Sequence, residues 1–173
     1  VLESSDAGRS FSVIGNPLPS EVTFGATIDL AASDPSRVYV SGSAKLGDAG
    51  VDGVVLRSSD RGATWATTPL HLGTDVPYIA AIDRADADVV WVRVDADVTD
   101  SLWRSHDGAA SFEKVFDSTG DLLGFAISAD GTKLAIGGPT DGVLVASLDG
   151  GAPTGAPAKK SALGARCLAF HGA

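Results

Sequence analysis

The sequence is poor in the residues that build the commonest kinds of functional site. It has a single cysteine, Cys167, so no disulfide can form within the chain. The three histidines, His71, His106 and His171, are far apart, and none has a Cys or another His at metal-ligand spacing. A phosphate-binding loop, a dinucleotide fingerprint and a nucleophile elbow are also missing. We therefore predict no metal site and no cofactor.

Basic residues and long apolar runs are scarce as well. There are 13 Lys and Arg against 22 Asp and Glu, and the formal net charge is −9. This balance argues against a nucleic-acid or anionic-membrane partner, which would need a basic patch. No apolar run reaches about 18 residues, so no transmembrane helix is predicted, and no signal peptide is visible. The chain begins at Val1 without a Met, which favours a processed chain or a piece of a longer one.

Most of the acid is Asp in turn-like stretches such as GDAGVDG and DRADADVV. We interpret these stretches as solvated loops, with calcium binding at the surface as the alternative. Aromatic residues are 6% of the chain, so a core must rely on Val, Ile, Leu and Ala. These residues alternate with polar ones in runs such as VYVSG and VWVRV, which is typical of half-buried strands. Only the short segment 159–169 is a helix candidate, and we predict an all-β fold.

What the sequence does have is a repeated motif, Ser-x-Asp-x-Gly-x-(Ser/Thr)-aromatic. It reads SSDAGRSF at 4–11, SSDRGATW at 58–65 and SHDGAASF at 105–112, with at most one departure in each copy. A weaker copy, SLDGGAPT, occupies 147–154 and lacks the aromatic. Successive aspartates are separated by 60 − 6 = 54, 107 − 60 = 47 and 149 − 107 = 42 residues. A motif at near-constant spacing indicates stacked copies of one supersecondary unit.

Each copy is suited to form the turn of a hairpin, with its polar groups hydrogen-bonded to one another within that turn. The Asp carboxylate can accept backbone N–H groups just ahead of it, and the Gly supplies a position with positive φ. The Ser and Thr hydroxyls can bond back to the turn, and the final aromatic is expected to begin the next strand and point into a core. We predict a structural role for these residues, with ion or ligand binding as the alternative. They are Ser4, Asp6, Gly8, Phe11, Ser58, Asp60, Gly62, Trp65, Ser105, Asp107, Phe112, Ser147, Asp149 and Gly151.

The motif resembles the Asp box, or BNR repeat, of sialidases, sortilin-type receptors, some endoglucanases and a photosystem-assembly factor. The resemblance implies a β-propeller whose boxes lie on the outer part of each blade, away from the usual active site. The chain is expected to hold a partial blade at 1–22, four-stranded antiparallel blades at 23–71, 72–117 and 118–153, and a partial strand at 163–173. We interpret it as a fragment of a larger propeller whose open blade edges allow copies to associate. The alternative is that the two ends meet in a fourth, incomplete blade.

No catalytic set can be assigned from the sequence. A sialidase-like site needs three arginines and a Tyr–Glu pair, yet neither Tyr39 nor Tyr78 has a recognisable Glu partner among Glu3, Glu21 and Glu113. Arg57 and Arg104 are candidates for substrate contact, but both stand just before a box, and this equivalence favours a structural or solvated role.

An endoglucanase-like site would need two carboxylates as acid and base. Asp29, Asp83 and Asp95 are candidates, but their spacing singles out no pair. Among the tryptophans we expect Trp65 and Trp91 in the core and Trp103 partly exposed.

The repeat without a catalytic set predicts a non-catalytic binding or scaffold module of a bacterial secreted or envelope-associated protein, with an unknown protein or glycan ligand. The alternative is a fragment of an Asp-box glycoside hydrolase, sialidase-like or endoglucanase-like.

Overall fold

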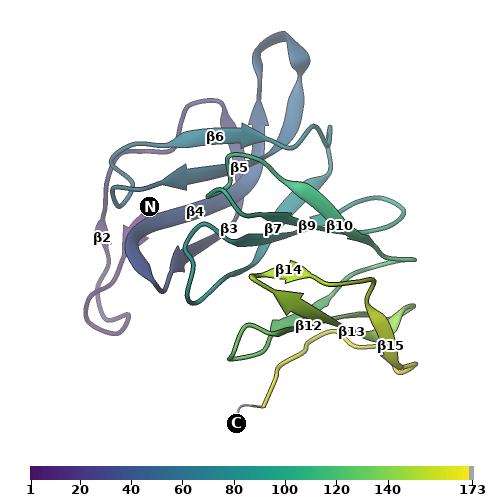
Figure 1. Ribbon diagram of the computed structural model, residues 1–173. Coiled ribbons are helices and arrows are strands. Elements are labelled where there is room, and N and C mark those ends of the chain that lie inside the picture. Colours follow the sequence, from purple (N-terminus) through teal and green to yellow (C-terminus); the bar gives the residue numbers. More distant parts are fainter. Residues whose placement is uncertain (172–173) are drawn as a thin grey trace.

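The computed structural model describes residues 1–171, and nearly all of its regular structure is antiparallel β-sheet (Figure 1). The sole helical element of this part is a single 3-10 turn, η1, at Gly47–Ala49. No helix of the described residues has the length and apolar character needed to cross a membrane. The all-β prediction is confirmed.

Three sheets follow one another along the chain, and the first four strands of each form a meander in which strands pair with their sequence neighbours. The third sheet has a fifth strand, which pairs with the third strand of that sheet. A two-stranded hairpin precedes the three sheets. The hairpin is β1 (Leu2–Glu3) and β2 (Ser12–Val13), and the first sheet is β3 (Val22–Ala31), β4 (Asp34–Lys45), β5 (Val51–Ser58) and β6 (Ala66–Pro69). The second sheet is β7 (Val76–Ile82), β8 (Val90–Asp95), β9 (Ser101–Ser105) and β10 (Glu113–Asp117). The third sheet is β11 (Gly124–Ile127), β12 (Lys133–Gly138), β13 (Gly142–Asp149), β14 (Ala152–Pro153) and β15 (Ala158–Ser161). Four-stranded antiparallel meanders of this length are propeller blades. The division of the chain into blades at the residues expected above stays a prediction.

The second sheet lies between the other two and buries both of its faces. Along β8, Val90, Val92 and Val94 point to one face and pack with Tyr39 and other residues of the first sheet. Trp91 points to the opposite face, where it joins a second cluster with residues of the third sheet. This period-2 alternation explains why VVWVRV is almost wholly apolar, since a strand buried on both faces has no solvent side.

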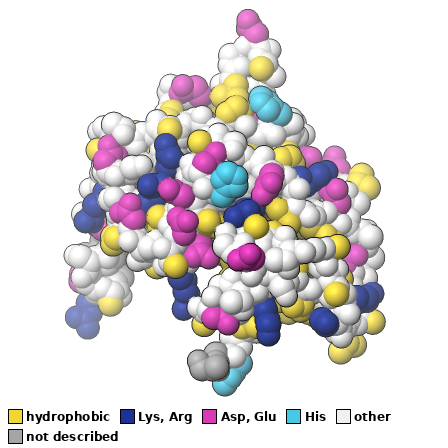
Figure 2. All heavy atoms as spheres, in the orientation of Figure 1, with side chains coloured by type: hydrophobic (Ala, Val, Ile, Leu, Met, Phe, Trp, Pro, Cys, Tyr) yellow, Lys and Arg dark blue, Asp and Glu magenta, His cyan; other side chains and the backbone are white. Residues whose placement is uncertain are grey.

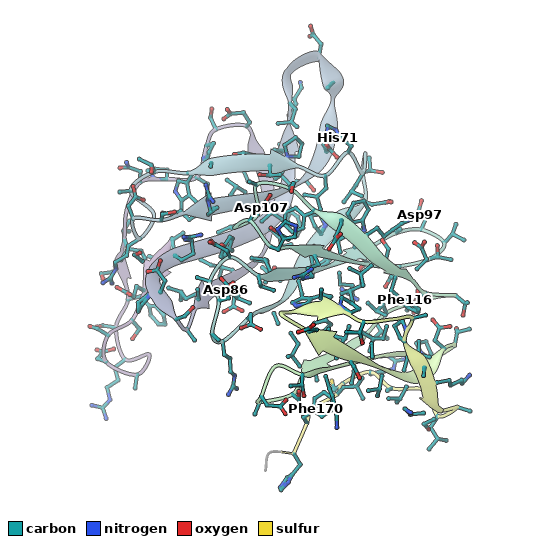
Figure 3. All side chains as sticks on the ribbon, in the orientation of Figure 1. His71, Asp86, Asp97, Asp107, Phe116 and Phe170 are labelled. Carbon is teal, nitrogen blue, oxygen red and sulfur yellow. The ribbon has the colours of Figure 1, made fainter. Side chains whose placement is uncertain are left out.

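The antiparallel course of the strands places their connections at two opposite ends of the sheets. The β3–β4, β7–β8 and β11–β12 turns and the Asp-box corners share one end, which we call the box end. The loops into β5, β9 and β13 and the crossovers at 70–75 and 118–123 share the other, the crossover end. Figure 3 shows the separation, with Asp86 and Asp107 at the box end and His71 and Asp97 at the crossover end.

The ends of the chain do not form a shared blade. β1 pairs with β2, and the N-terminus lies by the first sheet while the C-terminus lies beyond the third (Figure 1). The strand expected at 163–173 is absent over 163–171, and residues 172–173 lie outside the described part. Here Leu168 packs over Gly124 and Gly137, whose missing side chains leave room for it, so side-chain contact takes the place of a strand ladder.

The segment considered as a helix also differs from expectation. Its first residues belong to β15, which pairs with β13 and forms the outer edge of the third sheet. A short isolated helix is only marginally stable in water, whereas pairing with β13 gives the backbone of this segment hydrogen-bond partners.

Candidate functional site

The three Asp-box corners share one hydrogen-bond pattern. In the box at 58–65, Asp60 accepts the Ser58 hydroxyl at 2.7 Å, the Thr64 N–H at 2.8 Å and the Thr64 hydroxyl at 2.7 Å. The Ser58 hydroxyl oxygen in turn accepts the Gly62 N–H at 2.7 Å. Asp6 and Asp107 make the same contacts with Ser10 and Ser111. Each corner is thus closed by its own side chains.

Each corner also contains two consecutive residues with positive φ. They are Ala7 and Gly8, Arg61 and Gly62, and Gly108 and Ala109. The third box therefore keeps the backbone shape although its glycine comes one residue early. Ala109 takes the expected glycine's place with φ 64° and still donates its N–H to Ser105.

These contacts fix the protonation state of the box carboxylates. Hydrogen bonds from Ser10 lower the pKa of Asp6 to about 2, and those from Thr64 lower the pKa of Asp60 to about 2. Partial burial raises the pKa of Asp107, but hydrogen bonds from Ser111 outweigh it and the pKa is about 2. Groups this acidic stay ionised at neutral pH, so they are unsuited to act as general acids. A structural role for the box residues stays a prediction that this geometry motivates.

The box aromatics are less buried than expected. Phe11 is 64% exposed, because the two-stranded β1–β2 sheet offers it no packing partner. Trp65 is half-buried beside the cluster on the outer face of the first sheet, and its ring N–H reaches the Asn16 carbonyl at 3.4 Å. Phe112 is half-buried against the cluster between the first two sheets. Trp91 is fully buried and Trp103 half-buried, as predicted.

The weak fourth copy makes a different kind of turn. Asp149 pairs with Ala152 across a two-residue loop of Gly150 and Gly151, both with positive φ. This is the backbone of a type I′ hairpin turn. Ser147 and Asp149 are exposed, and among the described residues no hydrogen bond of the Asp149 carboxylate is present.

The sequence reasoning missed a second set of structural aspartates. Asp52 accepts the N–H groups of His71 and Leu72, and Asp100 accepts those of Ala96 and Leu122. Asp52 is the second residue of β5, and Asp100 immediately precedes β9. Each accepts hydrogen bonds from the backbone of the crossover that follows its sheet or leads to the next. Their equivalent positions, just before the apolar run that leads to a box, were the signal that could have found them.

Asp130 was missed too. It lies in the β11–β12 turn and accepts the hydroxyl groups of Ser128 and Thr132 and the Thr132 N–H. The hydrogen bond from Ser128 is the main reason that its pKa is lowered to about 2. The Ser-x-Asp spacing of SADGT resembles the start of a box, which was a usable sign.

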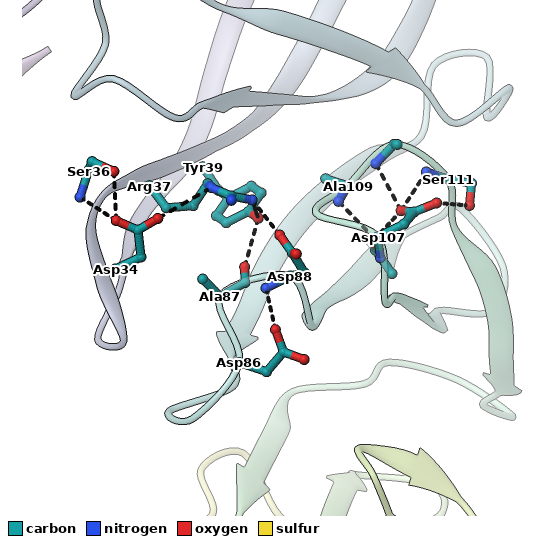
Figure 4. A network of polar contacts seen from close by, with 12 residues as sticks. Asp34, Ser36, Arg37, Tyr39, Asp86, Ala87, Asp88, Asp107, Ala109 and Ser111 are labelled. Carbon is teal, nitrogen blue, oxygen red and sulfur yellow. Dashed lines mark hydrogen bonds and ion pairs between the residues drawn. The ribbon is translucent and has the colours of Figure 1, made fainter.

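A polar latch joins the first two sheets at the box end (Figure 4). Arg37 at the start of β4 forms an ion pair with Asp88 in the β7–β8 turn. The Tyr39 hydroxyl, buried between the sheets, donates to the Ala87 carbonyl at 2.7 Å. Gly108 packs so closely on this latch that a Cβ there would lie 2.7 Å from Asp88 and 2.8 Å from Arg37. The latch positions one blade against the next.

The arginines considered for substrate contact are part of the framework or the latch. Arg104 is 5% exposed and contacts Glu113 at 3.2 Å and the Gly150 carbonyl at 3.3 Å. Arg57 is half-buried next to Gly108 in the third box.

The three candidate catalytic aspartates are not brought together as a recognisable pair. Asp29 accepts the N–H of the adjacent Leu30, and Asp83 accepts two N–H groups of its own turn, from Ala85 and Asp86. Asp95 is exposed at the end of β8, 3.9 Å from Arg93. Acidic side chains as a whole are spread over the face in Figure 2, and the described residues contain no cluster suited to a metal ion.

The best candidate for a functional site is a cavity of about 630 Å³ formed by the inner strands β7 and β11 with the C-terminal segment. Its walls include Tyr78, Arg93, Phe125 and Arg166. Arg93 lies over the Tyr78 ring, 4.9 Å from its centroid, and donates to the Leu122 carbonyl at 2.9 Å. We call this cavity the inner cleft. Leu122 and Leu123 belong to the crossover at 118–123, so the cleft lies toward the crossover end and away from the Asp boxes.

Comparison with known proteins relates the chain to one class of enzyme. It is 31% identical over 122 residues to a xyloglucanase of Hypocrea jecorina, covering 57% of this chain and 14% of that protein. It is 30% identical over 139 residues to xyloglucanase Xgh74A of Acetivibrio thermocellus, covering 67% and 16%. The chain thus spans about one sixth of the curated relatives' length. No family model matches it.

A solved structure supports the fold. The GH74 xyloglucanase from Xanthomonas campestris superposes with a TM-score of 0.53 at 20% identity, over 76% of this chain and 23% of the enzyme. The chain therefore matches part of a larger propeller, which agrees with the predicted architecture. Both curated relatives named above are xyloglucanases, which are glycoside hydrolases.

The expectation of a non-catalytic binding or scaffold module is contradicted by these relatives. They are hydrolases, and the alternative of a part of an Asp-box glycoside hydrolase is the better supported. The error came from treating the absence of a recognisable catalytic set as evidence about function. A stretch matching one sixth of an enzyme need not contain the reacting groups.

Proposed function

We propose that this chain is part of a glycoside hydrolase that acts on xyloglucan or a closely related β-glucan, and that it forms part of the enzyme's polysaccharide-binding surface. The observation that carries the proposal is the 30% identity to a xyloglucanase over two thirds of the chain. The inner cleft is the corresponding physical feature, because it is a concave site with aromatic and hydrogen-bonding groups in its walls.

The chemistry of the cleft suits a sugar polymer. Tyr78 and Phe125 offer apolar ring surface on which the C–H face of a pyranose can pack, and Thr27 and Arg93 offer polar groups for hydroxyls. A polysaccharide is too large to enter a cell unaided, so this substrate supports the prediction of a secreted or envelope-associated protein. The bacterial origin stays a prediction as well.

We assign no catalytic residue within the chain. The box aspartates have pKa values near 2 and lie at the far end from the cleft. The role proposed for this chain is to bind and orient the glycan, with the cleavage step supplied elsewhere in the enzyme.

Affinity electrophoresis tests the proposal with the chain as it stands. We expect migration to be retarded in a gel containing xyloglucan and unchanged in a gel without polysaccharide. Hydroxyethylcellulose, which lacks the xylose branches, tests whether the branches are recognised. Tyr78→Ala should abolish the retardation, whereas the matched control Phe11→Ala, an exposed aromatic of the N-terminal hairpin, should leave it unchanged. Unretarded migration of the folded chain in xyloglucan would contradict the proposal.

A further inference from the structure

The residues that line the inner cleft differ in charge from the rest of the protein surface. The chain carries a net charge of −9, yet the residues that line this cavity include two arginines and no carboxylate. The full lining is Thr27, Tyr78, Ile79, Ala80, Arg93, Leu122, Leu123, Gly124, Phe125, Arg166, Cys167 and Leu168. A cation-lined hollow in an acidic surface attracts and retains anionic groups.

The Arg93 side chain is held in place by contacts that leave some of its N–H donors without a hydrogen-bond partner. Its position is fixed by the hydrogen bond to the Leu122 carbonyl and by the Tyr78 ring beneath the guanidinium. Arg93 also forms long ion pairs with Asp95 at 3.9 Å and Asp100 at 3.8 Å, and neither distance is that of a hydrogen bond. Asp100 already accepts two backbone N–H groups. A guanidinium has five N–H donors, so Arg93 keeps donors beyond the one that bonds Leu122.

Arg166 supplies the second positive charge from the C-terminal segment of the chain. It belongs to the C-terminal segment that Leu168 anchors over Gly124 and Gly137. Its side chain is exposed, and it forms no ion pair with the residues that the structure describes. A planar guanidinium pairs with a carboxylate through two parallel hydrogen bonds, which makes arginine well suited to this kind of recognition.

We propose that the inner cleft binds the carboxylate of an acidic sugar residue, a uronic acid, within a glycan. Arg93 and Arg166 hold the carboxylate, while Tyr78 and Phe125 contact the C–H surface of the sugar ring. The inference rests on the proposed function for its choice of a glycan, and it adds an acidic substituent to a substrate class that the relatives' names do not describe as acidic.

A matched pair of ligands isolates the carboxylate. Isothermal titration of the chain with an oligosaccharide that carries one glucuronate, and with its carboxyl-reduced counterpart, should give at least about tenfold tighter binding of the acid. The difference should shrink as salt rises from about 50 to about 500 mM, because screening weakens the charge contribution. Equal affinity for the two ligands would overturn the proposal.

Variants then locate the site. Arg166→Ala should weaken binding of the glucuronate ligand about tenfold, because an exposed side chain can be removed without loss of folding. Arg84→Ala is the matched control, since Arg84 is an equally exposed arginine at the box end, and it should change nothing. An equal effect of the two variants would also overturn the proposal.

Two further outcomes are distinguishable. Inorganic phosphate that competes as strongly as the glucuronate ligand would show a general anion site and refute sugar recognition. Loss of uronate selectivity with xyloglucan retardation intact would refute this inference alone, whereas loss of both would refute the proposed function as well.

Discussion

The corner at Asp107 and the corner at Asp149 occupy the same place in successive repeats, yet they are built differently. At Asp107 the carboxylate closes the turn by accepting the Ala110 and Ser111 N–H groups and the Ser105 and Ser111 hydroxyls. At Asp149 two glycines with positive φ make the turn from backbone alone.

The difference teaches that the repeat keeps two left-handed residues after the aspartate but does not keep one set of hydrogen bonds. Side chains can hold two left-handed residues in place even when one is Ala109, while a Gly-Gly pair needs no such support. We therefore expect the carboxylate to be structural at Asp107 and dispensable at Asp149, although both stand in a Ser-x-Asp pattern.

The largest effect should come from removing the Asp107 carboxylate. We expect Asp107→Ala to lower the free energy of unfolding by about 1–2 kcal/mol, because donors of the turn lose their acceptor while partial exposure lets water replace some of it. Asp107→Asn, which keeps one acceptor oxygen, should lose less. Urea melts measure both, and equal losses would show that hydrogen-bond acceptance does not explain the corner.

The glycine corner should break at Gly151. Alanine there would adopt φ 74° and bring its Cβ to 3.3 Å from Val89 and 3.5 Å from Arg104. We expect Gly151→Ala to cost about 1–2 kcal/mol from backbone strain. Gly150→Ala is the control, because its Cβ meets nothing within 4 Å, and a thermal melt should show the smaller loss for it. The reverse order would mean that packing around Gly151 is looser than it appears in the structure.

Acid should weaken the box corners and leave the glycine corner unaffected. The folded-state pKa of Asp107 is about 2, below the value of about 3.9 in an unfolded chain. Its contribution to stability is therefore complete above about pH 4 and is lost as pH falls through about 2. We expect the melting temperature to fall over this window and Asp107→Asn to flatten the fall. A variant with the wild-type slope would argue against the assigned pKa shift.

The smallest effect should be that of Asp149→Ala. Because its exposed carboxylate makes no hydrogen bond with the described residues, we expect a change within about 0.5 kcal/mol. Compared with Asp107→Ala in the same melts, this variant sharpens the comparison between the two corners. A loss as large as that of Asp107→Ala would mean that the carboxylate of the weak box has a structural partner after all.

The fold could be predicted because its signals are local and repeated. VYV and VWV mark second strands in which Tyr39 and Trp91 face the next sheet, and the box spacing counts the units. The C-terminal segment could not be predicted, since the contact of Leu168 with Gly124 and Gly137 depends on two glycines some forty and thirty residues away that no local pattern links to it.

The candidate site was harder to predict than the fold. Tyr78, Arg93 and Arg166 come from three separate segments and converge only because β7 and β8 are neighbours and the chain returns past β11. The sequence shows them as a strand tyrosine, a strand arginine and a loop arginine, with no spacing to join them. Asp52 and Asp100 were hard to predict for a different reason, since the backbone N–H groups that they accept lie in the following crossovers and not in the same turn.

The order of the clusters has a consequence for how the chain folds as it is synthesised. Every strand pairs with a near neighbour in sequence, so the hydrogen bonds of the first sheet can be complete once β6 has left the ribosome. Its inner face, however, stays open until Val90, Val92 and Val94 arrive from β8 to fill the cluster around Tyr39. At each stage of synthesis, the most recently completed sheet therefore exposes one apolar face, and the next sheet to emerge covers it. The nascent chain is most prone to aggregate just after a sheet is finished, and a translational pause would be least harmful midway through the following one.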